Sequence, residues 1–385
     1  MRKILVVLGT RPEAIKMAPL VEALSCSDSR IDLKICVTGQ HGQMLQQALE
    51  VFGLAPDFDL NIMKSGQDLF DITASVLLQM RGVLSEVKPD LVMVHGDTTT
   101  SLCAALAAFY LKIKVAHIEA GLRTRDIFSP FPEELNRTFT ARIADLHFAP
   151  TEISRQNLLG EGVQDSDIFV VGNTAIDALH FMRKRIEDDT YLRARIQSQL
   201  NNKTKFDVSK DRFILITGHR RENFGKGFIN ICDAISELAD KYKSLRFVYP
   251  VHLNPNVQGP VNRILGRTKN VVLMEPVGYD LFNFLLAHCV LVLTDSGGVQ
   301  EEAPSFGKPV LVMRGTTERP EAITAGVAKL VGINREEIVK SVSEVLDTPS
   351  IYSRMVAQSN PFGDGKTSER IGKIIHNYLF GPKFK

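Results

Sequence analysis

Acidic side chains follow two neighbouring apolar runs in the first half of the sequence. Asp97 comes just after the run 91–94 in VMVHGDTTTS, and Glu119 follows the next run in VAHIEAGLR. A third carboxylate, Glu133, stands in SPFPEELNR, where Pro132 opens a predicted helix. Neighbouring carboxylates repel one another, which spreads their pKa values and lets one donate a proton while another accepts one. These three residues are therefore candidates for proton-transfer chemistry.

Glu133 also has a plainer interpretation. Together with Glu134 it falls in the first turn of the predicted helix, where acidic residues commonly do no more than support the positive end of the helix dipole. The presence of Asp97 and Glu119 after adjacent strands favours the catalytic interpretation.

Two cations follow the first apolar run of the chain, in GTRPEAIK. Arg11 stands before Pro12, a residue suited to a first helical turn, so Arg11 lies at the positive end of the helix dipole. Arg11 and Lys16 could hold an anion there, or they could pair with local carboxylates on a solvated face. A dinucleotide fingerprint needs GxGxxG at this turn, and only Gly9 is present, so we expect no nicotinamide cofactor. The nine histidines show no metal-ligand spacing, so we also expect no metal site.

The second half of the sequence offers a phosphate site. ILITGHRREN places His219 at a predicted strand end, and VLTDSGGVQEE contains a glycine-rich strand-to-helix turn made of Ser296, Gly297 and Gly298. Such a turn at a helix N-terminus can cradle a phosphate with backbone N–H groups. One turn later, Glu302 could accept both hydroxyls of a ribose, although it could also be an ordinary helix-surface glutamate. Arg319, in TTERPE, supplies a further cation.

These residues need a scaffold that brings strand ends together. Short runs rich in Val, Ile and Leu alternate with segments of helical periodicity, which is typical of βαβ units and a parallel sheet. Runs such as 4–8 and 290–293 are continuously apolar, as expected where helices cover both faces of a sheet. In open α/β sheets ligands bind beyond the carboxyl ends of the strands, and that is where the candidate residues fall.

The apolar runs fall into two groups. The first predicts strands near 3–9, 33–38, 90–95, 114–119, 146–149 and 168–172, and the second predicts strands near 213–218, 247–251, 271–275, 290–294 and 309–313. A charged and polar stretch at 183–211 lies between them. We therefore expect two doubly wound Rossmann-like domains, one at 1–175 and one at 205–360.

Size and composition agree with this organisation. At roughly 150 residues per domain, 385 residues favour two large domains. The 46 Lys and Arg nearly balance the 44 Asp and Glu, which excludes binding to nucleic acid or membranes by bulk charge. No apolar run approaches a membrane span, and the run 4–8 is too short for a secretory signal, so we expect a cytoplasmic protein. The five cysteines form no CxxC pair and are expected to be buried free thiols.

Nine motifs, in order and spacing, resemble the non-hydrolysing UDP-N-acetylglucosamine 2-epimerases. They are GTRPEAIK, VTGQH, VHGDTTT, HIEAGLRT, FPEELNR, TGHRREN, PVHLNPNV, LTDSGGVQEE and TTERPEA. The resemblance covers nearly the whole chain. It implies a fold of the glycosyltransferase-B type, in which two Rossmann-like domains face a central cleft, and a C-terminal helix at about 366–380 that packs back on the first domain. A homodimer is the expected assembly.

The resemblance also implies a reaction, the reversible conversion of UDP-GlcNAc into UDP-ManNAc. UDP would be eliminated to leave 2-acetamidoglucal and then added back, supplying ManNAc-type sugars for cell-surface polysaccharides without a cofactor. It assigns the family's catalytic group to Asp97, Glu119, Glu133 and His219. It assigns nucleotide-sugar contacts to Arg11, Lys16, Phe282, Ser296, Gly297, Gly298, Glu302 and Arg319. Part of a second, regulatory UDP-GlcNAc site is matched by Gln40, Gln43, Arg220 and His252, although Gly66 stands where some regulated relatives have Arg.

Two other functions compete with epimerisation. A glycosyltransferase of the same fold would use the same phosphate turn and ribose carboxylate but pass the sugar to an acceptor. A catalytically silent sugar-nucleotide sensor would be expected to lack Asp97, Glu119 or His219. All three are present, and the acidic candidates of the first domain favour epimerisation.

Overall fold

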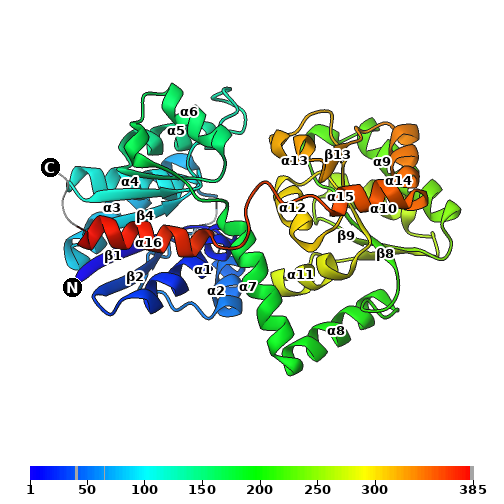
Figure 1. Ribbon diagram of the computed structural model, residues 1–385, viewed down its shortest axis with the longest axis horizontal. Helices are drawn as coiled ribbons and strands as arrows, with labels where there is room; N and C mark the ends of the chain where they lie inside the picture. Colours follow the sequence, from blue (N-terminus) through cyan, green and yellow to red (C-terminus); the bar gives the residue numbers. More distant parts are fainter. Residues whose placement is uncertain (40–41, 65, 382–385) are drawn as a thin grey trace. The chain divides into compact units, whose positions relative to one another are not determined.

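The computed structural model describes residues 1–39, 42–64 and 66–381, and it divides into two compact units (Figure 1). Unit 1 comprises Met1–Ala178 with Phe362–Lys385, and unit 2 comprises Leu179–Pro361. Each unit carries one parallel sheet covered by helices, which confirms the predicted class of two Rossmann-like folds. Residues 179–204, which fall between the two predicted domains, group with unit 2.

Unit 1 is built on a parallel sheet with the order β3-β2-β1-β4-β5-β6-β7. Its strands are β1 (Arg2–Leu8), β2 (Ile31–Val37), β3 (Phe58–Asp59), β4 (Leu91–His95), β5 (Lys114–Ile118), β6 (Leu146–Ala149) and β7 (Ile168–Val170). Its helices are α1 (Arg11–Ser27), α2 (Gly42–Phe52), α3 (Leu69–Val87), α4 (Thr99–Tyr110), α5 (Glu133–Ile143), α6 (Glu152–Gly160), the 3-10 turn η1 (Asp165–Asp167) and α16 (Thr367–Phe380). Helix α7 (Thr174–Asp188) begins in unit 1 and continues into unit 2.

The core of unit 1 lies on both faces of its sheet. Residues 4–8 of β1 are completely buried, as a continuously apolar central strand requires. Helix α1 packs against α2 and α16, while α4 packs against both α3 and α5. In Figure 1 the C-terminal helix α16 therefore lies beside the N-terminal helix α1, although the whole chain separates them in sequence.

Unit 2 repeats this design with the strand order β10-β9-β8-β11-β12-β13. Its strands are β8 (Phe213–Thr217), β9 (Arg246–Pro250), β10 (Val271–Met274), β11 (Leu291–Thr294), β12 (Val310–Val312) and β13 (Ala328–Leu330). Its helices are α8 (Thr190–Thr204), η2 (Arg221–Asn223), α9 (Lys226–Lys241), α10 (Pro255–Leu265), α11 (Tyr279–His288), α12 (Gly297–Glu302), η3 (Ala303–Phe306), α13 (Pro320–Thr324), α14 (Arg335–Asp347) and α15 (Pro349–Val356).

Each sheet has a topological switch point, where the chain order reverses between two adjacent central strands. In unit 1 it lies between β1 and β4, and in unit 2 between β8 and β11. Loops diverge there and open a crevice at the carboxyl ends of the strands. Arg11 and Asp97 follow the first pair of strands, and His219 and Ser296 follow the second. The motifs of the sequence thus fall at both switch points.

Two features differ from expectation. The sequence gives no sign of β3 and β13, which are edge strands of two and three residues, too short for a periodic pattern. Four cysteines are buried free thiols as expected, but Cys26 at the end of α1 is exposed. No helix in the described part of the chain is long and apolar enough to cross a membrane.

Candidate functional site

Asp97 lies in the turn between β4 and α4 and is held by α5. Arg137 forms an ion pair with its Oδ2, and Asn136 Nδ2 donates to its backbone oxygen at 2.9 Å. Burial raises the pKa of Asp97, Arg137 opposes this shift, and the nearby charges of Glu119 and Glu133 raise the pKa further. Since 27 % of the side chain remains accessible, a substrate can reach it. The structure thus places Glu119 and Glu133 within electrostatic reach of Asp97.

Glu119 follows β5 in a backbone conformation that few residues with a side chain adopt, with φ at 62°. Its Oε2 forms an ion pair with Lys16 and accepts a hydrogen bond of 3.0 Å from Asn173 Nδ2. The Nε2 atom of His95 lies 3.9 Å from the same oxygen. Burial lowers the pKa of His95 to about 4, so this ring is neutral at pH 7. Backbone strain of this kind recurs at functional sites. Of the two roles considered for Lys16, the structure shows pairing with a carboxylate, and its partner Glu119 is itself a catalytic candidate.

The loop that carries Arg11 is fastened to the loop that carries Asp97 by one buried carboxylate, Glu13. Glu13 accepts hydrogen bonds of 2.6–3.0 Å from the N–H groups of Gly9 and Thr10 and from the hydroxyls of Thr98 and Ser101. The two loops also approach closely, because a Cβ atom added to Gly9 would lie 2.2 Å from Thr100 Oγ1. The switch point of unit 1 is consequently a tightly constrained pair of loops.

The adjacent glutamates at the start of α5 have different surroundings. Glu134 is 4 % exposed, accepts hydrogen bonds from the N–H groups of Thr124 and Arg125, and lies 3.4 Å from an Arg137 nitrogen. It therefore has the structural task of fixing the turn that precedes the helix. Glu133 is only partly buried and acts electrostatically on Asp97. Of this pair, Glu133 is the one suited to chemistry.

In unit 2, His219 is held by a buried carboxylate that follows the neighbouring strand. Asp295 is fully buried and accepts hydrogen bonds from the N–H groups of His219 and Arg220 and from Asn223 Nδ2, at 2.9–3.2 Å. The His219 ring stacks on His252 with 5.3 Å between centroids. Burial lowers the pKa of His219, Asp295 opposes this, and the charges of His252 and Arg220 lower it further. The lowered pKa favours a neutral imidazole at pH 7, and the side chain is 42 % exposed, with Nδ1 3.7 Å from Asp295 Oδ1.

The glycine-rich turn of unit 2 lies beside two guanidinium groups. Ser296 is the N-cap of α12, and a Cβ atom added to Gly297 would lie 3.5 Å from Arg220 Nη2 and 3.7 Å from Arg319 Nη2. Arg319 Nε donates to Glu301 at 2.5 Å, which fixes the direction of its side chain. Backbone N–H groups and two guanidiniums that converge in this way could bind an anion, although Arg220 also pairs with Glu318 and Arg319 with Glu301. The structure thus brings the predicted phosphate turn, Arg319 and His219 together in unit 2.

The remaining predicted residues are three substrate contacts in helices of unit 2 and the four regulatory candidates. Phe282 lies in the first half of α11 and Glu302 ends α12, both partly exposed, and Gly298 is exposed in α12. Of the predicted regulatory residues, Gln40 lies outside the described residues and only the backbone of Gln43, in α2, is described. Arg220 and His252 both adjoin His219.

Several residues that hold this chemistry in place were missed by sequence reasoning. They are Asn136, Arg137, Asn173 and Asp295. Asp295 carried a signal, because it is a charged residue at the end of an apolar strand directly before Ser296. Asn173 carried none, because its contact with Glu119 spans 54 residues and belongs to the tertiary fold.

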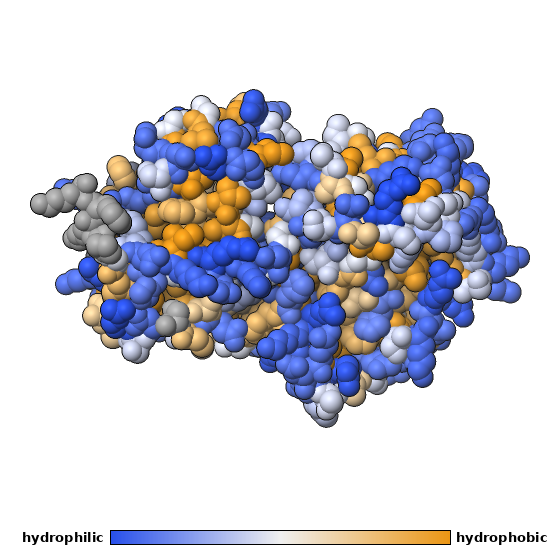
Figure 2. Space-filling model, in the orientation of Figure 1, coloured by the Kyte–Doolittle hydropathy of each residue, from blue (hydrophilic) through white to orange (hydrophobic). Residues whose placement is uncertain are grey.

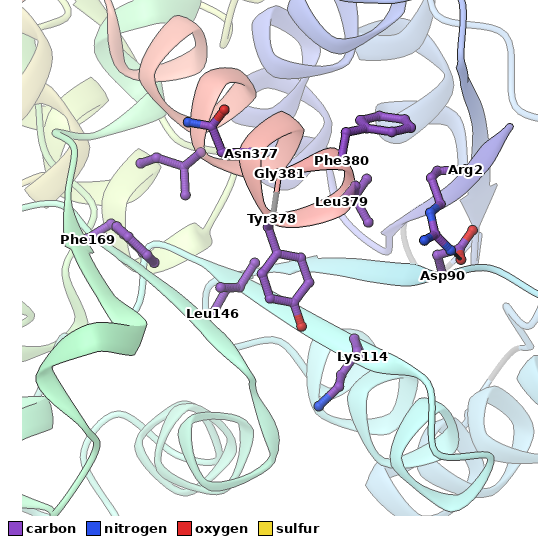
Figure 3. Close-up of a pocket in the computed structure, with 11 residues that line it drawn as sticks. Arg2, Asp90, Lys114, Leu146, Phe169, Asn377, Tyr378, Leu379, Phe380 and Gly381 are labelled. Atoms are coloured by element: carbon purple, nitrogen blue, oxygen red, sulfur yellow. Dashed lines mark hydrogen bonds and ion pairs between the residues drawn. The ribbon is translucent and has the colours of Figure 1, made fainter. Parts of the chain in front are cut away.

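A cavity of about 1280 Å³ in unit 1 lies away from these residues. Figure 3 shows Tyr378 of α16 over it, with Lys114 and Leu146 at the starts of β5 and β6. Apolar side chains gather on the surface of unit 1 beside α16 (Figure 2). The cavity therefore adjoins the amino ends of the strands, whereas the carboxylates follow the carboxyl ends, where α/β folds bind their ligands. Within the described residues, no group of three His, Cys, Asp or Glu side chains is placed to hold a metal ion.

One Rossmann-like unit carries acidic side chains and the other a glycine-rich turn, each at the carboxyl ends of its strands. The family of UDP-N-acetylglucosamine 2-epimerases matches residues 25–376. The UDP-N-acetylglucosamine 2-epimerase of Escherichia coli K12 is 54 % identical over 375 residues, which cover 97 % of this chain and 98 % of that one. That of Campylobacter jejuni is 50 % identical over 374 residues and 97 % of each chain. The chain belongs to the UDP-N-acetylglucosamine 2-epimerase family and is an isomerase, which confirms the family indicated by the nine motifs.

Solved structures agree with this assignment. The crystal structure of UDP-GlcNAc 2-epimerase from Neisseria meningitidis bound to UDP-GlcNAc is 48 % identical, covers 97 % of this chain and 99 % of its own, and has a TM-score of 0.88. That of Methanocaldococcus jannaschii UDP-GlcNAc 2-epimerase in complex with UDP-GlcNAc and UDP is 38 % identical over 97 % of this chain and 99 % of its own, with a TM-score of 0.79.

Proposed function

We propose that this protein interconverts UDP-GlcNAc and UDP-ManNAc by inverting carbon C2 of the sugar. The observation that carries the proposal is the placement of Asp97 and Glu119 just after the paired strands β4 and β5 of unit 1, with Glu133 at the start of α5 and its charge acting on Asp97. Epimerisation removes a proton from one face of C2 and returns one to the other, so it needs groups that can act as base and as acid. The relatives that bind UDP-GlcNAc in their structures support the same substrate here.

The C2 hydrogen of this sugar is not acidic, because no carbonyl group adjoins that carbon. The route we propose is therefore an elimination. The base takes the C2 proton, the C1–O bond breaks, and UDP leaves with the bonding electron pair. The products at this stage are 2-acetamidoglucal and UDP, and addition of UDP with protonation on the opposite face of C2 gives the epimer.

The departing diphosphate needs several donors at once. A turnover near 10 per second requires the activation free energy to be no higher than about 16 kcal/mol. One well-placed hydrogen-bond donor lowers the activation free energy by only about 3–4 kcal/mol, so several donors must act together. We assign this task to the Gly297 turn, Arg319 and His219, and the closeness of Gly297 to the Arg319 guanidinium in unit 2 supports it. We assign Phe282 and Glu302 to the uridine and its ribose, and Arg11 with Lys16 to further substrate contacts.

The finer biological roles are also proposals. We propose a homodimer that acts in the cytoplasm and supplies ManNAc-type sugars for cell-surface polysaccharides. We propose that Gln40, Gln43, Arg220 and His252 form part of a second, regulatory UDP-GlcNAc site. The stacking of His252 on His219 gives a direct contact through which binding at such a site could act on a catalytic residue.

Product analysis tests the function against its rivals. Purified protein is incubated with UDP-GlcNAc or with UDP-ManNAc, each with and without an added acceptor sugar, and nucleotide sugars, free UDP and 2-acetamidoglucal are separated by chromatography. We expect UDP-ManNAc to accumulate to a fixed ratio from either direction, and Asp97→Asn to abolish most of it. Sugar transfer to an added acceptor without an epimer would identify a glycosyltransferase. Saturable binding without any product would identify a sensor.

A further inference from the structure

Asn173 lies just before α7, and its side chain has a fixed orientation. The residue is 2 % exposed. Its Oδ1 accepts a hydrogen bond of 2.9 Å from the N–H of Ala175, and its Nδ2 donates to Glu119 Oε2 at 3.0 Å. A backbone N–H can only donate, so the oxygen of the amide must face Ala175 and the NH₂ group must face Glu119. The contact with Glu119 therefore follows from hydrogen-bond chemistry and does not depend on an arbitrary choice of amide flip.

The charged and titratable groups around Glu119 come from three elements. Lys16 on α1 pairs with Oε2, His95 on β4 lies 3.9 Å from that oxygen, and Asp97 follows β4. Lys16 and Asn173 both bind Oε2, which directs the other oxygen, Oε1, toward the backbone before Asp97. A Cβ atom added to Gly96 would lie 3.6 Å from Oε1. Two donors on one oxygen thus fix the orientation of the carboxylate, with its other oxygen beside Gly96.

The backbone of Asn173 is anchored as firmly as its side chain. Its N–H donates at 2.7 Å to the oxygen of Phe362, the residue at which the chain returns to unit 1. One turn later on α7, the buried carboxylate of Asp177 accepts hydrogen bonds from the N–H groups of Thr367 and Ser368, at the start of α16. These contacts hold the amide of Asn173 in place, which is what a rigid support for a reactive group requires.

We infer that Asn173 is a positioning residue, which holds the Glu119 carboxylate by its Nδ2 hydrogen bond in the orientation needed for proton transfer. The role rests on the proposed function, because it gives Glu119 a part in the reaction at C2. Asn173 does not touch the substrate in this role, and it acts only through Glu119.

The exchange Asn173→Asp tests the role with little change in shape. An aspartate keeps the oxygen that accepts from Ala175 but presents a second carboxylate oxygen to Glu119 in place of a donor. We expect kcat to fall about tenfold or more with KM changed less than about threefold, and the acid limb of the pH–rate profile to move up by roughly one unit, the low end for a charge at this range. An unchanged profile in an active variant would overturn the role.

Asp177→Asn is the matched control. It is also an exchange between a buried carboxylate and a buried amide, one turn further on in α7, but the hydrogen bonds that it alters run to the start of α16 and not to Glu119. We expect it to lower the melting temperature without moving the acid limb. If Asp177→Asn moved the limb as Asn173→Asp does, the effect would belong to the packing of α7 and α16, and the positioning role would be wrong.

A second measurement does not depend on activity. The melting temperatures of Asn173→Asp, Glu119→Gln and the double variant form a double-mutant cycle. We expect Asn173→Asp to lower the melting temperature by roughly 2 °C or more in the wild-type background. In the Glu119→Gln background we expect little change, because the amide introduced there can donate to the new carboxylate. An equal decrease in both backgrounds would overturn the contact. A wild type that forms no UDP-ManNAc would refute the proposed function instead, and the cycle would still decide whether Asn173 holds Glu119.

Discussion

Removal of the Arg137 guanidinium should change the pH dependence of the reaction in a defined direction. Burial, Glu119 and Glu133 all raise the pKa of Asp97, and Arg137 is the strongest opposing influence. An opposite charge this close lowers a carboxyl pKa by roughly one to three units, or about 1.4 kcal/mol per unit. Asp97 is 27 % accessible, so water screens part of the interaction and the lower end applies. Arg137→Gln should therefore raise the pKa of Asp97 further, by about one unit.

The assay is the pH dependence of kcat/KM for UDP-GlcNAc between about pH 5 and 9, whose limbs report the essential groups of the free enzyme. We expect the limb that belongs to Asp97 to move up by about one unit in Arg137→Gln, while Glu134 keeps its two backbone donors and the start of α5 stays folded. The control is Arg2→Gln. It removes an ion pair of 2.7 Å with Asp90, which precedes β4, whereas Asp97 follows β4. Identical limbs in Arg137→Gln and wild type would refute the electrostatic account of Asp97.

Two further predictions follow from close contacts and from buried histidines. Gly297→Ala should leave the melting temperature nearly unchanged, because the nearest atom to the new Cβ, Arg220 Nη2, lies 3.5 Å away, an ordinary van der Waals distance. The same methyl group would occupy the space between the two guanidiniums, so UDP binding should weaken about tenfold or more. Gly259→Ala on α10, where a Cβ atom meets nothing within 4 Å, is the control, and equal UDP affinities measured by calorimetry would count against the anion site. His117 is fully buried, and burial lowers its pKa to about 3 from 6.5, so the unfolded chain binds a proton before the folded one does. The folded protein therefore keeps its full free energy of unfolding above about pH 6.5 and loses part of it as the pH falls toward 3. For His117 alone this loss is about 2–3 kcal/mol between pH 7.5 and 4.5. Urea unfolding should show that the free energy of unfolding of His117→Gln decreases less between pH 7.5 and 4.5, by that amount, than that of the wild type. An equal decrease in both proteins would show that groups other than His117 cause it.

The sequence predicted the parts of this fold that local pattern determines. Continuous apolar runs such as 4–8 and 290–293 identified central strands of both sheets, because a strand covered by helices on both faces is mostly apolar. Once the strands were known, the carboxyl-end rule pointed to Asp97, Glu119, His219 and the turn at Ser296. The edge strands β3 and β13 escaped, since two or three residues carry no period.

The supports of the site could not be predicted in the same way. Glu133 and Glu134 are alike in sequence, and only the fold shows that Glu134 binds the turn at Thr124. Arg137 reaches Asp97 across 40 residues, and Asn173 reaches Glu119 across 54. Contacts of this length depend on how helices pack on the sheet, and no local rule for spacing or composition contains that information.

The central claim is that the chain exchanges the C2 proton of UDP-GlcNAc through its carboxylates. Incubation of the wild type with UDP-GlcNAc in heavy water, followed by proton NMR of the recovered nucleotide sugars, tests this directly. We predict that UDP-ManNAc forms and that deuterium enters C2, with both effects reduced roughly 100-fold or more in Asp97→Asn, as is typical when general acid or base catalysis is lost. UDP-ManNAc that retained the original hydrogen at C2, or full exchange in Asp97→Asn, Glu119→Gln and Glu133→Gln alike, would contradict the account.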